Sequence, residues 1–251
     1  MERHRDALPS LYARTGKSKV IIITKQEWRY EDQLGHRFTF HPNMSFLRIK
    51  NMIQGVVDPM VTCSGMKPGD QVLDCTMGMG ADAIVASFAV GEQGKVIALE
   101  SQPEIAALVR QGLATYETKL VKCNQAMRRI QVVQTDYHTF LKAQPNQSFD
   151  IVIFDPMFRE TVRSSAAMQV LKPLANPHPV EPFSVKEAVR VARKAVLLKE
   201  RVYSTEFTRL GFEVVKKSSH YAWGMIRLGG NEDENSTTGH CRANCGRENS
   251  T

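Results

Sequence analysis

The sequence lacks any apolar run long enough to span a membrane, and residues 1–19 lack the hydrophobic core of a signal peptide. We therefore expect a cytoplasmic protein with no membrane partner. Cysteine is also scarce, and its five positions do not form the regularly spaced framework of small secreted domains, so reduced thiols are expected. No internal repeat or heptad pattern is present, which argues against a solenoid or a coiled coil.

Large apolar residues are rare at both ends of the sequence. Residues 229–251 are too polar to offset the entropy of ordering, so a disordered tail is expected there. His240, Cys241 and Cys245 lie in this tail without a second Cys or His pair of suitable spacing, which disfavours a metal site. Residues 1–17 are basic and polar and are expected to contribute little core.

What is present is an excess of basic residues and enough apolar residues for one sizeable core. The chain has 251 residues, of which 42% are hydrophobic, and this favours one main domain with a small appendage. We assign residues 1–55 to an N-terminal extension or small subdomain and residues 56–228 to the main domain. Lys plus Arg is 33 against 26 for Asp plus Glu, a formal charge of +7, which favours an anionic partner such as nucleic acid.

Short apolar runs alternate with longer amphipathic stretches along the chain. The runs predict strands at residues 20–23, 71–75, 95–100, 130–134, 150–154 and 194–199. The amphipathic stretches predict helices at residues 44–54, 81–90, 103–116, 137–143, 185–192 and 205–210. A closing hairpin is predicted from residues 212–217 and 221–228. Strands separated by helices indicate an α/β fold with a doubly wound, mainly parallel sheet.

The run at 71–75 contains Asp74 and is followed by a loop with two glycines, Gly78 and Gly80. Glycines let the backbone approach a ligand and turn into a helix whose N–H groups face the bound group. The spacing Gly78-x-Gly80-x-x-Ala83 also fits the dinucleotide fingerprint, with Glu100 placed as the ribose-binding acid. Asp74 favours a different cofactor, because a carboxylate there would repel a pyrophosphate and attract the cationic S-adenosylmethionine.

Acidic residues end four successive predicted strands: Asp74, Glu100, Asp136 and Asp155. Ligands of doubly wound sheets bind at the carboxyl ends of the strands, so these residues are candidates for one site. Glu100 can accept bonds from two ribose hydroxyls, and Asp136 can accept one from an adenine amino group. Asp is also common at strand exits and helix caps, so a fortuitous series is the alternative, but the spacing favours a cofactor site.

The segments VLDCTMGMGADAIVAS, ALES, TDYHTF and FDIVIFDPMF together resemble class I S-adenosylmethionine-dependent methyltransferases. More narrowly, they resemble the bacterial family that includes the 16S ribosomal-RNA guanine-N2 methyltransferase and its uncharacterised relatives in low-GC Gram-positive bacteria. The resemblance extends from about His41 to Met225 and includes the segments HPNMSFLRIKN, LVRQGL and LLKERVYSTEFTRLGF.

This resemblance implies a Rossmann-like sheet of seven strands with an antiparallel C-terminal hairpin strand, and it makes residues 56–228 the methyltransferase domain. It assigns to S-adenosylmethionine the residues Asp74, Gly78, Gly80, Glu100 and Asp136. Their neighbours Thr76, Asp82, Ser101 and Tyr137 complete the predicted cofactor site. For Asp82, capping of the helix that begins at residue 81 is an equally weighted alternative.

The stretch Asp155-Pro156-Met157-Phe158 resembles the (Asn/Asp/Ser)-Pro-Pro-(Tyr/Phe) signature of methyltransferases that act on exocyclic amino groups. The Asp155 carboxylate and the Pro156 carbonyl would accept the two N–H bonds of the amino group, and Phe158 would stack on the base. Met157 departs from that signature, as it does in the ribosomal-RNA branch. The alternative is a simple turn in which Phe158 packs in the core. Methyl transfer from a sulfonium needs mainly positioning, so no metal or covalent nucleophile is expected.

Further residues are predicted to contact the substrate: Arg159 in a basic, loop-rich segment, His41 and Arg48 upstream, and Lys199 at the end of a strand. A solvated face is the alternative for any one of these charges. The expected function is methyl transfer from S-adenosylmethionine to an exocyclic amino group, with guanine N2 in ribosomal RNA as the favoured target. Small-molecule methylation and RNA binding without catalysis are the alternatives, and the chain could act as a monomer or a homodimer.

Overall fold

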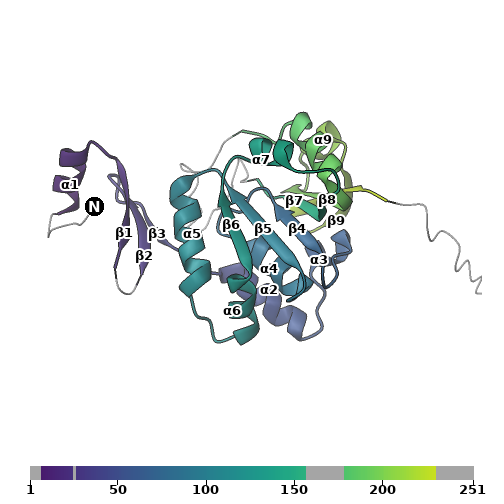
Figure 1. The fold of residues 1–251 in the computed structure, drawn as a ribbon, viewed down its shortest axis with the longest axis horizontal. Coiled ribbons are helices and arrows are strands. Elements are labelled where there is room, and N and C mark those ends of the chain that lie inside the picture. Colours follow the sequence, from purple (N-terminus) through teal and green to yellow (C-terminus); the bar gives the residue numbers. More distant parts are fainter. Residues whose placement is uncertain (1–6, 25–26, 157–177, 230–251) are drawn as a thin grey trace, which may run out of the picture.

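A seven-stranded sheet forms the centre of the fold, in the order β6-β5-β4-β7-β8-β10-β9 (Figure 1). The computed structural model describes residues 7–24, 27–156 and 178–229. The strands are β4 (Gln71–Asp74), β5 (Lys95–Glu100), β6 (Ile130–Gln134), β7 (Phe149–Phe154), β8 (Ala192–Arg201), β9 (Glu213–Lys217) and β10 (Tyr221–Arg227). Neighbours from β6 to β8 are parallel, whereas β10 is antiparallel to both β8 and β9. The predicted mainly parallel sheet with an antiparallel C-terminal hairpin strand is confirmed.

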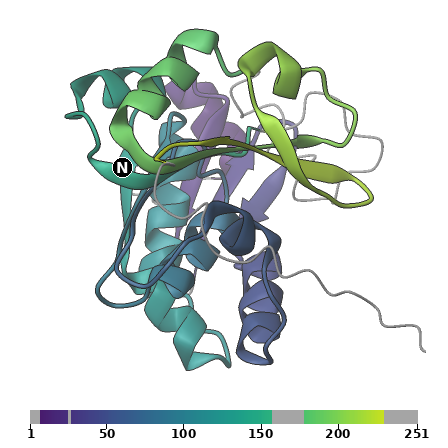
Figure 2. The ribbon, with the colours of Figure 1, turned by 90° about the vertical axis from the view of Figure 1, so that its right-hand side faces the viewer.

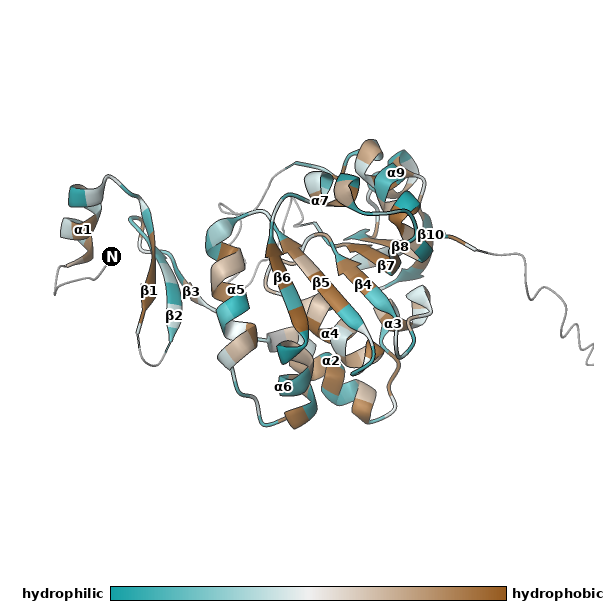
Figure 3. Cartoon of the chain, viewed as in Figure 1, coloured by the Kyte–Doolittle hydropathy of each residue, from teal (hydrophilic) through white to brown (hydrophobic). Residues whose placement is uncertain are grey.

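Alternation along the strands gives this sheet two buried faces. Val72 and Leu73 of β4 point into different clusters of the core, and Ala98 and Leu99 of β5 divide in the same way. One face packs against α4 (Ala81–Val90), α5 (Pro103–Thr115) and α6 (Val121–Arg128), and the other against α7 (Tyr137–Ala143), α9 (Pro182–Val191) and α10 (Glu206–Leu210). In Figure 2 the sheet separates the green helices α9 and α10 from the blue α4. Burial on both faces explains why these strands are continuous apolar runs, brown in Figure 3.

A helix and a small antiparallel sheet precede the central sheet (Figure 1). They are α1 (Leu8–Thr15), β1 (Lys19–Ile23), β2 (Trp28–Asp32) and β3 (Arg37–Thr39). β2 of the small sheet contacts α5, and α1 lies on the far side of the small sheet from α5 (Figure 1). Residues 1–17 were predicted to contribute little core; among the described residues 7–17 the buried side chain is that of Tyr12, which is 6% exposed and whose hydroxyl donates to the Glu31 carbonyl at 3.1 Å. Lys19 pairs with Glu104 of α5 at 2.7 Å, so the small sheet is tied to the main body.

Two further helices lead from the small sheet to the central one. α2 (Asn43–Ile53) lies within one residue of its predicted bounds and packs on α4. α3 (Pro59–Ser64) begins after Asp58, whose side chain accepts the N–H groups of Met60 and Val61. The last strand of the small sheet ends at Thr39. α2 follows it and packs with the main body, although it lies within the predicted extension 1–55.

Some predictions fall on residues that the structure does not describe. The predicted tail from residue 230 onward, with His240, Cys241 and Cys245, lies outside the described residues. Within the described ranges, no helix has both the length and the apolar character needed to cross a membrane. In the same ranges, no three His, Cys, Asp or Glu side chains are arranged to hold a metal ion.

Candidate active site

The glycine loop after β4 is fixed against the neighbouring strand β5. Met77 donates its N–H to the Leu99 carbonyl at 2.9 Å. Gly78 and Gly80 have φ values of 49° and 79°, the left-handed region that glycine adopts without strain. A Cβ added to Gly78 would meet only the carbonyl oxygen of Thr76, at 3.9 Å. The backbone of the loop at Gly78 is therefore open to the close approach of a bound group.

Two carboxyl groups at adjacent strand ends, Asp74 and Glu100, hold this loop. Asp74 is 1% exposed, and its Oδ1 accepts the N–H of Thr76 at 3.0 Å. Glu100 accepts the N–H of Gly78 at Oε2 (3.1 Å) and the N–H of Gln102 at Oε1 (2.8 Å). Burial raises the pKa of both carboxyl groups, that of Asp74 to about 8. Glu100 thus connects the glycine loop to the segment that opens α5.

The turn that follows β7 lies directly beside the glycine loop. The N–H of Asp155 donates to Oγ1 of Thr76 at 2.6 Å. β4 and β7 are parallel neighbours, with Asp74 opposite Ile153, so both strands end at the same edge of the sheet. The structure therefore brings the predicted cofactor loop and the predicted acceptor residues Asp155 and Pro156 together, and it gives the Thr76 side chain the task of holding the turn.

Five charged side chains from five segments form a series of ion pairs that ends at Asp155. Arg48 of α2 donates from Nε to Asp58 Oδ2 (2.7 Å) and from Nη2 to Asp58 Oδ1 (2.9 Å), and its Nη1 pairs with Asp82. Lys199 Nζ of β8 lies 3.3 Å from Asp82 Oδ2 and 2.9 Å from Asp155 Oδ2. Asp82 serves two cations, and the N-terminus of α4 has no side-chain cap, so Asp82 is not the cap of that helix.

These contacts move the pKa values of Asp82 and Asp155 in opposite directions. Burial by itself would raise the pKa of Asp82, but Lys199 and Arg48 outweigh it and hold that pKa below the usual range. Burial, partly offset by Lys199 and reinforced by Asp82, raises the pKa of Asp155 to about 7. The Asp155 side chain is 28% exposed against 3% for Asp82. Asp155 is therefore the acid that a substrate can reach and that titrates near neutral pH.

Two aromatic rings complete the surroundings of Lys199. Trp223 lies opposite Lys199 in the β8–β10 register, and its ring centroid is 5.4 Å from Nζ, while the Tyr221 centroid is 5.2 Å away. The sequence analysis missed both rings and also Asp58. The pair Asp58-Pro59 does signal a helix start, but nothing in that local pattern reveals an ion pair with α2.

The other predicted cofactor residues follow β5 and β6. Ser101 comes directly after β5, and Asp136 accepts the N–H of His138 at 2.9 Å and so caps α7. The Tyr137 ring meets Phe154 edge to face, with the centroids 5.6 Å apart, and burial next to Asp136 raises its pKa to about 12. All three lie along the edge that carries Glu100, since β6, β5, β4 and β7 are consecutive parallel strands.

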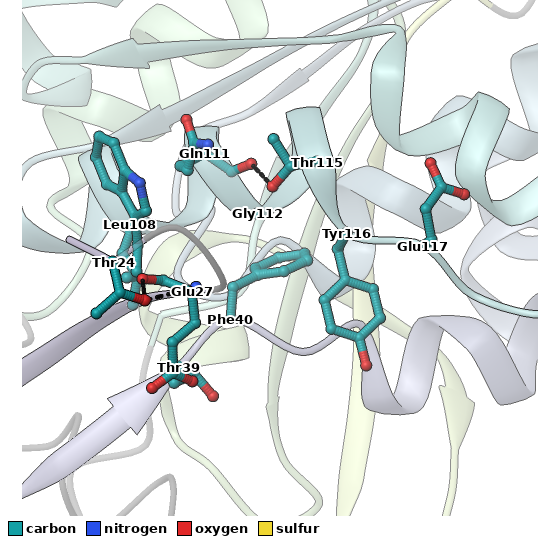
Figure 4. A pocket seen from close by; sticks show the side chains of 11 residues that line it. Thr24, Glu27, Thr39, Phe40, Leu108, Gln111, Gly112, Thr115, Tyr116 and Glu117 are labelled. Carbon is teal, nitrogen blue, oxygen red and sulfur yellow. Dashed lines mark hydrogen bonds between the residues drawn. The ribbon is translucent and has the colours of Figure 1, made fainter.

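His41 does not join this edge. Its ring packs edge to face on Tyr116, with the centroids 5.1 Å apart. Tyr116 follows the last turn of α5, where Arg128, just before β6 begins, donates to its carbonyl at 2.8 Å. This is the opposite end of the sheet from Asp155. A cavity of about 560 Å³ lies there between the small sheet and α5, with the rings of Phe40 and Tyr116 on its wall (Figure 4).

The structure describes Arg48 but not Met157, Phe158 and Arg159, the other residues predicted at the substrate end. Arg48 lies in the series of ion pairs, yet its guanidinium contacts Asp58 and Asp82.

Comparison with known proteins agrees with the fold. Residues 37–219 match the family model described as "Putative SAM-dependent methyltransferase". The chain belongs to this family of S-adenosylmethionine-dependent methyltransferases. The methyltransferase is 40% identical over 215 residues to "Uncharacterized protein YpiP" of Bacillus subtilis (strain 168), which covers 85% of this chain and 84% of that protein.

Two other similarities are more distant. The methyltransferase is 30% identical over 116 residues, 45% of its length and 50% of the relative's, to "Ribosomal RNA small subunit methyltransferase J" of Rhodopseudomonas palustris (strain HaA2). A crystal structure of an S-adenosylmethionine-dependent methyltransferase from Neisseria gonorrhoeae has the same fold, with a TM-score of 0.59 at 14% identity and 88% of each chain covered.

The residues of this methyltransferase suit its cofactor, S-adenosylmethionine. The open side of Gly78 leaves room beside the loop, and the buried carboxyl groups at the strand ends would repel a pyrophosphate, which this cofactor lacks. Glu100 accepts the N–H groups of Gly78 and Gln102, one at each oxygen.

Proposed function

We propose that this methyltransferase methylates an exocyclic amino group of a base in RNA, with guanine N2 of ribosomal RNA as the favoured target. The observation that carries the proposal is the position of Asp155 and Pro156 at the end of β7, one hydrogen bond away from the glycine loop. A base bound at this turn has its amino group beside the cofactor site.

The chemistry requires two hydrogen-bond acceptors at that turn. The lone pair of a base amino group is delocalised into the ring, so the nitrogen is a poor nucleophile until its N–H bonds are held out of the ring plane. The Asp155 carboxylate and the Pro156 carbonyl accept these two N–H bonds and favour the tetrahedral nitrogen of the transition state. S-adenosylmethionine supplies the electrophilic methyl group on its sulfonium.

Positioning accounts for the rest of the reaction. An in-line displacement depends on the distance and angle between the attacking nitrogen and the methyl carbon. Holding the two groups in this geometry can lower the activation free energy by several kcal/mol. The bond from Asp155 N–H to Thr76 Oγ1 joins the acceptor turn to the loop that faces the cofactor. The two reacting groups are therefore positioned by one continuous piece of structure.

Two observations support RNA as the substrate. Relatives at 30% and 34% identity, over less than half of this chain, are named ribosomal RNA small subunit methyltransferase J. The formal charge of +7 favours binding to a polyanion.

The test uses ribosomal RNA from cells of the source organism whose gene for this protein has been deleted. The purified protein is given this RNA and S-adenosylmethionine with a deuterated methyl group, and the nucleosides are then separated by mass spectrometry. We expect labelled N2-methylguanosine, and none with the Asp155→Ala variant, which removes the acceptor. Label on a ribose oxygen or a base carbon would refute the proposal, and label found only on small molecules would favour a small-molecule methyltransferase.

A further inference from the structure

A series of ion pairs lies beside the acceptor turn, and the charges of its members alternate in sign: Asp58, Arg48, Asp82, Lys199 and Asp155. Each cation lies between two carboxylates. Asp155 is the last member, so it has one cationic neighbour in this series where Asp82 has two. The charge state of Asp155 therefore depends on Lys199 more than that of Asp82 does.

The Lys199 ammonium is paired within the protein. The side chain is 18% exposed, and its ammonium faces two carboxylates and two aromatic rings. A lysine that binds RNA phosphates in the way predicted from the sequence would need a free ammonium at the surface. The contacts instead indicate a role within the protein.

We propose that Lys199 is a positioning residue, which keeps Asp155 ionised and holds its Oδ2 while the carboxylate accepts the amino group of the substrate. Asp82, itself held by Arg48, keeps the Lys199 ammonium at this place. The contact with the amino group rests on the proposed function, whereas the control of the charge on Asp155 does not.

The surroundings of Asp155 show why one cation matters. Asp82 approaches from α4 and Asp74 from β4, while Glu100 of β5 lies beyond Asp74, and Lys199 of β8 is the cation in direct contact. Burial and these acids all favour the neutral carboxyl group. A neutral Asp155 would carry an O–H donor where the substrate presents N–H donors, and one acceptor would be lost. Lys199 opposes that protonation.

A titration of Asp155 tests this inference without any RNA. The carboxyl groups are labelled with ¹³C, the Asp155 signal is assigned with Asp155→Asn, and its pKa is measured by NMR. In Lys199→Met the pKa of Asp155 should rise by about 1 to 3 units, because a cation in contact lowers a carboxyl pKa by that amount. Lys199→Arg keeps the charge and should hold the wild-type pKa. Lys199→Gln is a second neutral variant, and its side chain keeps a hydrogen-bond donor.

Lys194 provides a matched control. It lies on the same strand, β8, and it also bridges two aspartates, Asp70 (2.5 Å) and Asp150 (3.5 Å), but at the opposite end of the sheet. Lys194→Met should therefore leave the pKa of Asp155 unchanged, although it removes a paired lysine from the same strand.

The outcomes separate this inference from the proposed function. If the pKa of Asp155 does not move in either neutral variant, Lys199 is not a positioning residue, even where the protein methylates RNA. If the pKa rises as expected but wild-type protein methylates no RNA, the inference stands and the proposed function falls. Where RNA is methylated, the acidic limb of the pH–rate profile should move upward in Lys199→Met by the same number of units. A loss of S-adenosylmethionine affinity with an unmoved pKa would make Lys199 a cofactor contact and overturn the proposal.

Discussion

Replacing Thr76 by valine tests whether the cofactor loop positions the acceptor turn. Valine keeps the branched shape but removes the Oγ1 that accepts the N–H of Asp155 at 2.6 Å. A polar group that loses its partner on burial costs about 1 to 3 kcal/mol. The turn is only partly buried and can relax toward water, so we expect about 1 to 2 kcal/mol to appear as a displaced Asp155, which corresponds to a roughly 5- to 30-fold slower methyl transfer.

The assay is single-turnover methyl transfer at saturating S-adenosylmethionine, with cofactor affinity measured separately by calorimetry. Thr76→Ser is the matched control, because it keeps the hydroxyl and should retain most of the rate. Equal losses in Thr76→Val and Thr76→Ser would show that the hydroxyl bond is not what positions Asp155. A loss of cofactor affinity at an unchanged rate would refute the reasoning in another way, since Thr76 would then contact the cofactor, as the sequence resemblance implies.

Three further predictions concern the cofactor, the stability and the small sheet. Glu100→Ala should weaken S-adenosylmethionine binding about 100-fold in calorimetry, because two charge-assisted bonds of about 1.5 kcal/mol each are lost; an unchanged affinity would remove Glu100 from the ribose site. Arg193 lowers the pKa of Asp150 to about 2, so this pair contributes stability above about pH 4 and loses it as the pH falls toward 2. The free energy of unfolding in urea at pH 6 should be about 1 to 2 kcal/mol higher for wild type than for Asp150→Asn, a value reduced because Arg193 is partly exposed to solvent. If the same difference persisted at pH 2, the predicted loss of stability with falling pH would be wrong. Gly112→Ala would place a Cβ 2.1 Å from the Phe40 ring, so the contact between α5 and the segment after the small sheet should loosen. Residues 7–41 should then be cleaved at protease concentrations that leave wild type intact.

The strands of the central sheet could be predicted because burial on both faces leaves a simple signal. The run at 95–100 coincides with β5, and β7, whose six residues are all buried, begins one residue before its predicted start. In the small sheet the apolar run at 20–23 predicted β1, but β2 and β3 gave no such signal. Trp28–Asp32 is mostly polar, and its core contribution comes from Tyr30, whose ring stacks on Phe38 of β3 with the centroids 4.9 Å apart. A strand stabilised by one ring pair does not show a hydrophobic period in the sequence.

The composition of the site was predictable in part, since strand ends of a parallel sheet meet at one edge. That rule placed Asp74, Glu100 and Asp155 together, and the structure agrees. It could not assign partners within the edge. Arg48 and Asp82 are 34 residues apart, and Lys199 is 117 residues from Asp82, so no local pattern in the sequence reports their contact.

The pairing matters because it changes which acid is available for chemistry. The sequence places Asp82 in the predicted cofactor site and Asp155 in the acceptor motif, but it does not show which cations pair with them. In the structure Asp82 is buried between Arg48 and Lys199, whereas Asp155 shares Lys199 and remains partly exposed. We expect a carboxylate between two cations to attract a ligand less than a partly exposed one with a single cationic neighbour and a pKa of about 7. This difference supports Asp155 as the proposed acceptor, and it arises from residues far from the acceptor motif.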